Sequence, residues 1–129
     1  MIAADTNVVV RLLAGDDPAQ AERAKALFAS ETIFLSKTVM LETEWVLRRL
    51  YGTGRAETLN ALGGLASLPN VRCEDDATLV DALAWARQGL DFADALHLAS
   101  SRTAARFATF DEHFVKRARG VGGAAVYRL

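Results

Sequence analysis

Short apolar runs alternate along the chain with longer segments in which apolar residues recur every three or four positions. The longer spacing is typical of amphipathic helices, whereas short and almost wholly apolar runs are typical of strands buried on both faces. The pattern predicts strands at 2–4, 32–35, 71–73, 107–110 and 124–127. It predicts helices at 7–14, from 18 onward, and at 38–51, 55–68, 76–88, 91–105 and 112–119.

Glycine and proline mark where several of these helices begin and end. Gly15 and Gly52 follow predicted helices, as residues that readily adopt left-handed backbone often do. Asp17 and Pro18 give another helix a capping side chain and a rigid first residue. Because strands and helices alternate, we expect a three-layer α/β/α fold with a short, mainly parallel sheet of four or five strands. No repeat or obvious linker interrupts residues 1–129, so a single domain is expected.

The composition is that of a globular protein with one sizeable core. Of the 129 residues, 51% are hydrophobic, yet no segment reaches the ~20 continuous apolar residues of a membrane span. The first residues lack the basic start of a signal peptide. Cys73 is alone, so no internal disulfide can form, and its expected role is that of a small buried apolar residue. We therefore expect a cytoplasmic protein.

The charge balance neither indicates nor excludes a nucleic-acid substrate. Fifteen basic residues, mostly arginine, oppose 16 acidic ones, for a formal net charge of −1. If several acids held divalent cations at one site, the rest of the surface would be mildly basic. The cations that could contact an RNA backbone, unless they are only solvated surface charges, are Arg11, Arg48, Arg49, Arg102, Arg106, Lys116, Arg117 and Arg119.

Two aspartates come directly after predicted strands. Asp5 follows the first strand, and Asp111 follows the run at 107–110. In open α/β sheets the functional crevice lies beyond the carboxyl ends of the strands, so these carboxylates would meet if the two strands are neighbours. Each aspartate could instead serve only as the cap of the helix that follows it.

Four further acids lie on predicted helices. Asp91 and Asp94 are three residues apart and share a helix face, which next to other carboxylates would suit a cation, although Asp91 could be only an N-cap. On another helix, an i,i+4 ion pair with Arg48 would explain Glu44, which leaves Glu42 as the acid that needs a reason. Periodicity alone does not decide which of the two glutamates points inward.

The chemistry that suits such a set of acids is narrow. Unpaired buried carboxylates are very costly, so a cluster needs protons or cations. Oxygen ligands suit hard ions such as Mg²⁺ or Mn²⁺, whereas one Cys and two His make a poor zinc site. The sequence has neither a glycine-rich phosphate loop nor a GxSxG nucleophile motif. The acids therefore indicate hydrolysis of a phosphodiester by a metal-activated water.

Four segments, in this order, resemble the PIN-domain nucleases and, within them, the VapC-type toxins. They are Asp5-Thr6-Asn7-Val8 with Arg11, then LETEWV at 41–46, FADALHLA at 92–99 and TFDEHF at 109–114. The resemblance covers nearly the whole chain. It implies a PIN-like fold with a parallel sheet and RNA cleavage that depends on Mg²⁺ or Mn²⁺. It also implies a homodimer and a VapB-like antitoxin partner that blocks the site.

The resemblance also implies roles for individual residues. The acidic positions of the family, which are catalytic and hold the metal, fall on Asp5, Glu42, Asp94 and Asp111. Asp91 stands where some members carry a further acid and is a secondary metal ligand. The polar positions that would brace these acids through hydrogen bonds, unless they serve only in caps or turns, fall on Thr6, Asn7 and Thr109.

Apolar side chains on the first helices exceed what a small core needs. They are Leu12, Leu13, Phe28, Trp45, Leu50 and Tyr51. Together with the resemblance, this excess favours an exposed groove that would receive a partner helix. Trp45 and Phe92 could stack on bases, but packing in the core is their expected role.

Two other interpretations stay open. The chain could be a PIN nuclease without a toxin role, acting in RNA processing or on DNA; a neighbouring gene for a small DNA-binding protein would favour the toxin. A receiver-type signalling module is much less favoured, because it needs adjacent acids after the first strand, where Thr6 follows Asp5, and a late lysine outside a helix. A binding module that uses the acids only as caps is equally disfavoured.

Overall fold

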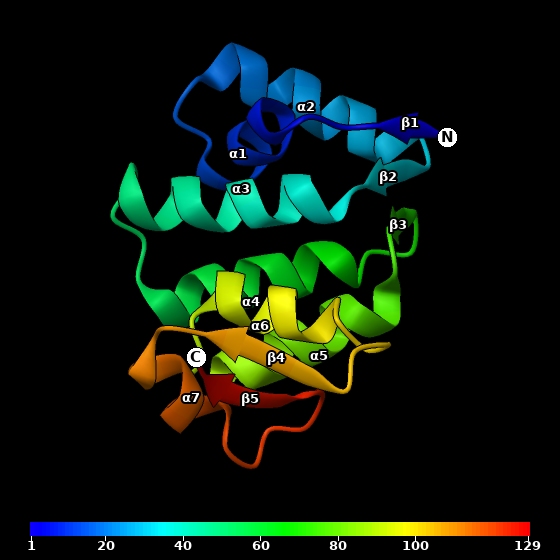
Figure 1. Ribbon diagram of the computed structural model, residues 1–129. Helices are drawn as coiled ribbons and strands as arrows, with labels where there is room; N and C mark the ends of the chain where they lie inside the picture. Colours follow the sequence, from blue (N-terminus) through cyan, green and yellow to red (C-terminus); the bar gives the residue numbers. More distant parts are fainter. The chain divides into compact units, whose positions relative to one another are not determined.

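The computed structural model describes all 129 residues, which form two compact units, residues 1–76 and 77–129 (Figure 1). Each unit has a parallel sheet and buried apolar side chains of its own. The chain contains seven helices and five strands in all. None of the helices combines the length and apolar character that crossing a membrane requires.

The first unit contains three short strands and four complete helices. In chain order they are β1 (Ile2–Ala3), α1 (Thr6–Ala14), α2 (Pro18–Ser30), β2 (Ile33–Leu35), α3 (Lys37–Arg49), α4 (Arg55–Ala66) and β3 (Val71–Cys73). The strands pair in parallel in the order β1-β2-β3, with Ile33 opposite both Ile2 and Val71. Helix α1 packs against α2 and α3, and α3 packs against α4. The fully buried side chains include Val9, Ile33, Leu35, Met40 and Leu62.

Local sequence signals set the ends of α1 and α2 as predicted. Gly15 has a φ of 66° and ends α1, and its N–H donates to the carbonyl of Arg11 at 3.0 Å. The Asp17 carboxylate then accepts a hydrogen bond from the N–H of Gln20 at 3.1 Å, and Pro18 is the first residue of α2. The sharp connection between the two helices is therefore determined by residues within it.

The second unit is built around two paired strands. Its elements are α5 (Asp76–Arg87), whose first residue belongs to the first unit, and α6 (Phe92–Ala99), β4 (Arg106–Thr109), α7 (Glu112–Ala118) and β5 (Ala125–Arg128). Strands β4 and β5 are parallel and paired along their whole length, and α7 packs against both. The rings of Phe107 and Phe114 pack with centroids 5.4 Å apart. Gly123, with a φ of 75°, lies where a Cβ atom would come within 3.0 Å of Trp85.

The predicted α/β class and the parallel pairing of the strands are confirmed. The five strands pair as a three-stranded and a two-stranded sheet. The helix predicted to run to residue 105 was too long, because α6 ends at Ala99. Beyond it, the Ser101 hydroxyl donates to the His97 carbonyl at 2.8 Å and the Ala104 N–H donates to the Ser101 carbonyl at 3.1 Å. Hydrogen bonds of this local kind compete with continuation of a helix.

The two aromatic residues expected in the core behave differently. Phe92 is 2% exposed, as predicted, whereas Trp45 is 53% exposed, so its expected place in the core was wrong. The buried residues of α3 are Met40, Thr43, Glu44 and Leu47, and Trp45 lies on another face of the helix. Among the other apolar residues expected at a groove, Phe28 is buried, whereas Leu50 and Tyr51 are exposed. Cys73 is half-buried rather than fully buried.

Candidate active site

In the second unit, two other aspartates influence Asp94. Asp94 lies in the first turn of α6 and is half-buried. Burial raises the pKa of Asp94, and the negative charges of Asp91 and Asp111 raise it further, while His97 opposes the shift. The start of α6 and the end of β4 therefore bring together three acids that sequence analysis had selected separately.

Asp91 is the N-cap of α6, as the simpler interpretation of this residue expected. Its Oδ2 atom accepts a hydrogen bond from the backbone N–H of Asp94 at 3.4 Å. The bond occupies one carboxylate oxygen and leaves the negative charge beside Asp94 in place. A capping role for Asp91 is therefore present, and it is compatible with a second role towards a cation.

Asp111 is the N-cap of α7 and is itself held by Thr109. The Oδ1 atom of Asp111 accepts hydrogen bonds from the N–H groups of His113 at 2.8 Å and Phe114 at 3.3 Å. The N–H of Asp111 donates to the Thr109 hydroxyl at 3.0 Å. Thr109 thus holds the backbone of Asp111. The sequence had suggested a supporting hydrogen bond from Thr109 without indicating which atom of the acid it would contact.

In the first unit, Asp5 stands at the N-cap position of α1 but does not cap it with its side chain. The β1–β2 ladder continues to Ala4, whose N–H donates to the Phe34 carbonyl at 3.1 Å, and Asp5 follows at once. The exposed carboxylate of Asp5 accepts no hydrogen bond from the helix. The Asp5 side chain therefore does not serve as a helix cap, and its carboxylate is available to bind a ligand.

The two glutamates of α3 have opposite environments. Glu44 is 6% exposed and forms the predicted ion pair with Arg48, with 3.7 Å between Oε1 and Nη1. Glu42 is exposed and makes no ion pair. The inward glutamate, which periodicity could not identify, is therefore Glu44, and Glu42 is the one whose carboxylate is free.

Beside these acids, two buried hydroxyls lack partners. Thr6 is 4% exposed and Thr43 is 0% exposed, and neither Oγ1 atom has a hydrogen-bond partner. Leaving such a group unpaired costs about 1–3 kcal/mol. Thr43, which sequence analysis did not single out, lies between Glu42 and Glu44, and only packing distinguishes it from other helical threonines. Asn7 is exposed and makes no hydrogen bond within the protein.

The donors in both units fit a hard divalent cation by their chemistry. They are carboxylates: Asp5 and Glu42 in the first unit, and Asp91, Asp94 and Asp111 in the second. No three acidic, histidine or cysteine side chains stand in an arrangement that could hold a metal ion. Oxygen donors suit Mg²⁺ or Mn²⁺, and the repulsion felt by Asp94 is of the kind that a cation relieves.

The cations expected to contact RNA fall into two groups. Those held by partners within the protein are Arg11, Arg48, Arg102, Arg106 and Arg117. Those that are exposed and make no such contact are Arg49, Lys116 and Arg119. The charges of the second group are not engaged by any internal contact and are fully available to an anion.

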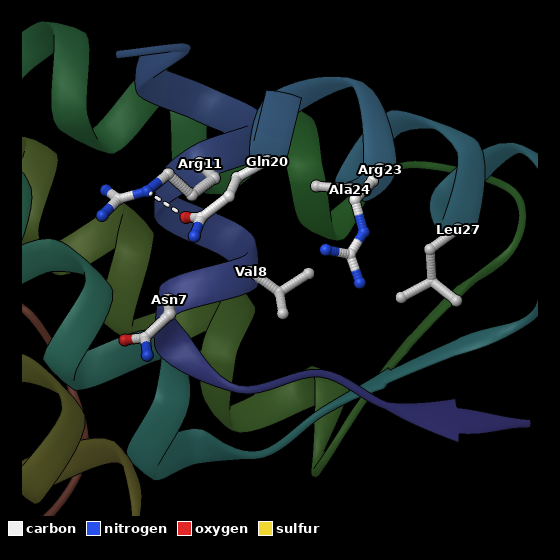
Figure 2. Close-up of a pocket in the computed structure, with 7 residues that line it drawn as sticks. All are labelled: Asn7, Val8, Arg11, Gln20, Arg23, Ala24 and Leu27. Atoms are coloured by element: carbon white, nitrogen blue, oxygen red, sulfur yellow. Dashed lines mark hydrogen bonds between the residues drawn. The ribbon is translucent and has the colours of Figure 1, made fainter. Parts of the chain in front are cut away.

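A pocket of about 510 Å³ lies on the first unit, between α1 and α2 (Figure 2). Its lining residues are Asn7, Val8, Arg11, Gln20, Arg23, Ala24 and Leu27. Asn7, one of these residues, is two positions after Asp5 in the sequence. Sequence analysis had selected Asn7 and Arg11 but not Gln20 or Arg23. The sequence could have indicated Gln20 and Arg23, because together with Leu27 they recur at the spacing of one helix face.

The short parallel strands, the helices between them and the acids at strand ends and helix starts define an α/β protein with a carboxylate-based site. Residues 2–120 match the PIN-domain family, and the chain belongs to that family. The match runs across both units.

One solved structure that is similar is the crystal structure of the VapC20 toxin of Mycobacterium tuberculosis, described as cleaving the sarcin–ricin loop. It is 24% identical, with a TM-score of 0.47, and the similarity covers 95% of this chain and 99% of that one. No curated protein matched the sequence. The assignment to the family rests on the match over residues 2–120.

Proposed function

We propose that this PIN-domain protein is an endoribonuclease that depends on Mg²⁺ or Mn²⁺ and serves as the toxin of a VapBC-type toxin–antitoxin pair. Membership of the family supports a nuclease. That match over residues 2–120 is the observation that carries the proposal. Asp94 adds support, because burial and then the charges of Asp91 and Asp111 raise its pKa. Carboxylates placed so that they repel one another are unfavourable for a protein that never binds a cation.

The residues on which cleavage would depend are Asp5, Glu42, Asp94 and Asp111, with Asp91 as a secondary ligand. Their carboxylates would hold the metal, which when bound activates a water and neutralises charge on the phosphate. The protein itself supplies oriented ligands. Thr109 fixes the backbone of Asp111 through a 3.0 Å hydrogen bond, and Asp91 fixes the first turn of α6 on which Asp94 lies. Thr6 and Asn7 would support Asp5, which they follow in the chain.

The toxin assignment implies a protein partner. Trp45, Leu50 and Tyr51 are exposed on or just after α3, which supports burial of this surface by another chain. We propose that a VapB-like antitoxin covers the toxin, that the toxin is a homodimer, and that it acts in the cytoplasm. A PIN nuclease of RNA processing remains the second candidate, and the product of the neighbouring gene distinguishes the two.

The test is incubation of the purified protein with mixed RNAs in Mg²⁺, in Mn²⁺ and in EDTA. We expect cleavage with either metal and none in EDTA. Asp5→Asn and Asp94→Asn should each lower cleavage about 100-fold or more, because even the groups that support metal ligands are worth about 10–100-fold. The matched control is Asp81→Asn, which breaks a surface ion pair with Arg102 and should cleave normally.

Two results would contradict the proposal. Cleavage that persists in EDTA, or in Asp94→Asn protein free of contaminating nuclease, would argue against the metal-dependent site. Production of the active protein without harm to the host, when the Asp94→Asn variant behaves identically, would argue against a toxin. Suppression of growth arrest by the product of the adjacent gene would support the antitoxin.

A further inference from the structure

The pocket between α1 and α2 has a fixed polar wall (Figure 2). Arg11 donates from Nε to the Oε1 atom of Gln20 at 2.7 Å, and from Nη1 to the hydroxyl of Tyr51 at 2.8 Å. The Arg11 Nη1 atom also lies 3.3 Å from Asp16, which balances its charge. Arg11 is thus ion-paired with Asp16, and its hydrogen bond occupies the oxygen end of the Gln20 amide.

This network leaves hydrogen-bond donors facing the pocket. Because the Oε1 atom of Gln20 accepts from Arg11, the amide group that remains is the Nε2 donor. Arg23 makes no ion pair or hydrogen bond within the protein, and its guanidinium carries donors only. Asn7 contributes an amide that is also without an internal partner. A pocket lined in this way selects ligands rich in acceptors and negative charge, of which a phosphodiester backbone is one.

The rest of the lining is apolar and suits the remainder of a nucleotide. Figure 2 shows the Arg23 guanidinium near the side chains of Val8 and Leu27, which line the same pocket with Ala24. Such a surface can pack against a ribose or the face of a base while the guanidinium holds the phosphate.

We propose that this pocket is an RNA subsite that binds one nucleotide of the substrate. Arg23 contacts the phosphate, the Nε2 group of Gln20 donates to a phosphate or base oxygen, and Arg11 is the positioning residue that orients Gln20. The proposal rests on the proposed ribonuclease function and names how the substrate is held. A protein segment is the competing occupant, and the free donors and unpaired cation favour RNA over an apolar helix.

The test measures RNA binding separately from cleavage. Binding of a fluorescein-labelled single-stranded RNA of mixed sequence is followed by anisotropy in EDTA, over a series of salt concentrations. Arg23→Ala should weaken binding about tenfold, and the slope of log affinity against log salt should fall by about 0.7, as expected for one lost contact to a single strand. Arg23→Lys should recover part of the affinity. Gln20→Glu, which replaces a donor by a negative charge, should also weaken binding.

The matched control is Lys25→Ala, which removes one positive charge from the same helix outside the pocket lining. Lys25 pairs with Glu22 on the exposed side of α2 and should bind RNA normally when replaced. In cleavage assays with Mn²⁺, Arg23→Ala should raise KM while leaving kcat within about twofold, because a contact made equally in the ground state and the transition state affects binding alone.

The possible results distinguish failure of the proposed subsite from failure of the proposed ribonuclease function. Equal RNA affinity of Arg23→Ala and wild-type protein would overturn the subsite even if RNA is cleaved, as would equal losses in Arg23→Ala and Lys25→Ala. Loss of antitoxin binding in Arg23→Ala with RNA affinity unchanged would identify the pocket as a protein interface and also overturn it. Wild-type protein that binds RNA through Arg23 but never cleaves it would contradict the proposed function and support the subsite.

Discussion

The Oδ2 atom of Asp91 accepts a hydrogen bond from the backbone N–H of Asp94 at 3.4 Å, so one acid caps the helix turn that carries the other. Burial raises the pKa of Asp94, and the charge of Asp91 beside it raises that pKa further. One contact therefore stabilises α6 and destabilises the ionised form of Asp94. The first two predictions separate these effects.

Asp91→Asn and Asp91→Ala should differ in stability because asparagine can cap a helix and alanine cannot. We expect Asp91→Ala to lower the free energy of unfolding by about 1 kcal/mol relative to Asp91→Asn, which keeps the cap and removes the charge beside Asp94 and so should be at least as stable as the wild-type protein. Denaturant unfolding in EDTA measures both. In cleavage, Asp91→Asn should lose less activity than Asp94→Asn, and equal losses would show that Asp91 is as essential a ligand as Asp94.

Asp94→Asn should raise the melting temperature of the metal-free protein at pH 7 by a few degrees. Burial and the neighbouring carboxylates raise the pKa of Asp94 above its ordinary value of 3.8, so its ionised form is less favourable in the folded than in the unfolded chain. The resulting loss of stability is complete above the raised pKa and disappears as the pH falls towards the unfolded value. The advantage of the variant should disappear over the same range.

Thermal unfolding in EDTA at a series of pH values from 7 downward tests whether the higher melting temperature of Asp94→Asn disappears as the pH falls. If Asp94 holds the cation as proposed, saturating Mn²⁺ should raise the melting temperature of the wild-type protein more than that of Asp94→Asn, because a ligand that binds the folded state stabilises it. A variant that melts below the wild-type protein at neutral pH without metal would contradict the repulsion inferred from the structure.

Thr43→Val should stabilise the protein, whereas Thr58→Val should destabilise it. Both threonines are 0% exposed and lie on helices, but the Thr58 hydroxyl donates to the Gly54 carbonyl at 2.9 Å and the Thr43 hydroxyl has no partner. Replacing an unpaired buried hydroxyl by a methyl group of similar size should gain about 1 kcal/mol, and removing a bonded one should cost a similar amount. Urea unfolding of the two variants measures the change in the free energy of unfolding. Equal changes in the two variants would contradict the prediction.

Tyr51→Phe should lower the melting temperature at neutral pH. The Tyr51 hydroxyl donates to the Oδ2 atom of Asp16 at 2.8 Å, and this hydrogen bond, with the charge of Arg11, lowers the pKa of Asp16 below 3.8. A lowered pKa means that the ionised carboxylate stabilises the folded state above the unfolded value, and that this contribution is lost as the pH falls. The difference between variant and wild type should therefore narrow below about pH 4.

The control for this prediction is Tyr127→Phe. The Tyr127 ring lies under the Arg106 guanidinium at 3.8 Å, and its hydroxyl makes no hydrogen bond within the protein, so loss of the hydroxyl should leave the pH profile unchanged. Matching pH profiles for the two phenylalanine variants would show that the bond between Tyr51 and Asp16 contributes nothing measurable.

The sequence alone determined the features that depend on a few neighbouring residues. Gly15 ends α1 and the pair Asp17 and Pro18 starts α2 where predicted, because left-handed backbone, a capping carboxylate and a fixed φ are properties of single residues. The strand predicted at 71–73 has the same bounds in the structure. The sequence was also enough to identify the acids as candidate metal ligands, because a carboxylate can bind a cation wherever it stands in the chain.

Only the tertiary structure decided what each selected side chain does. Asp5 and Asp111 both stand at helix starts after strands, yet Asp111 caps its helix and Asp5 does not. Glu44 rather than Glu42 is buried, and Trp45 is exposed, because neighbouring elements cover one face of α3 and not another. The pKa of Asp94 is raised by burial, by Asp91 and by a carboxylate 17 positions further along the chain. Burial and distances between atoms remote in sequence exist only once the elements have packed.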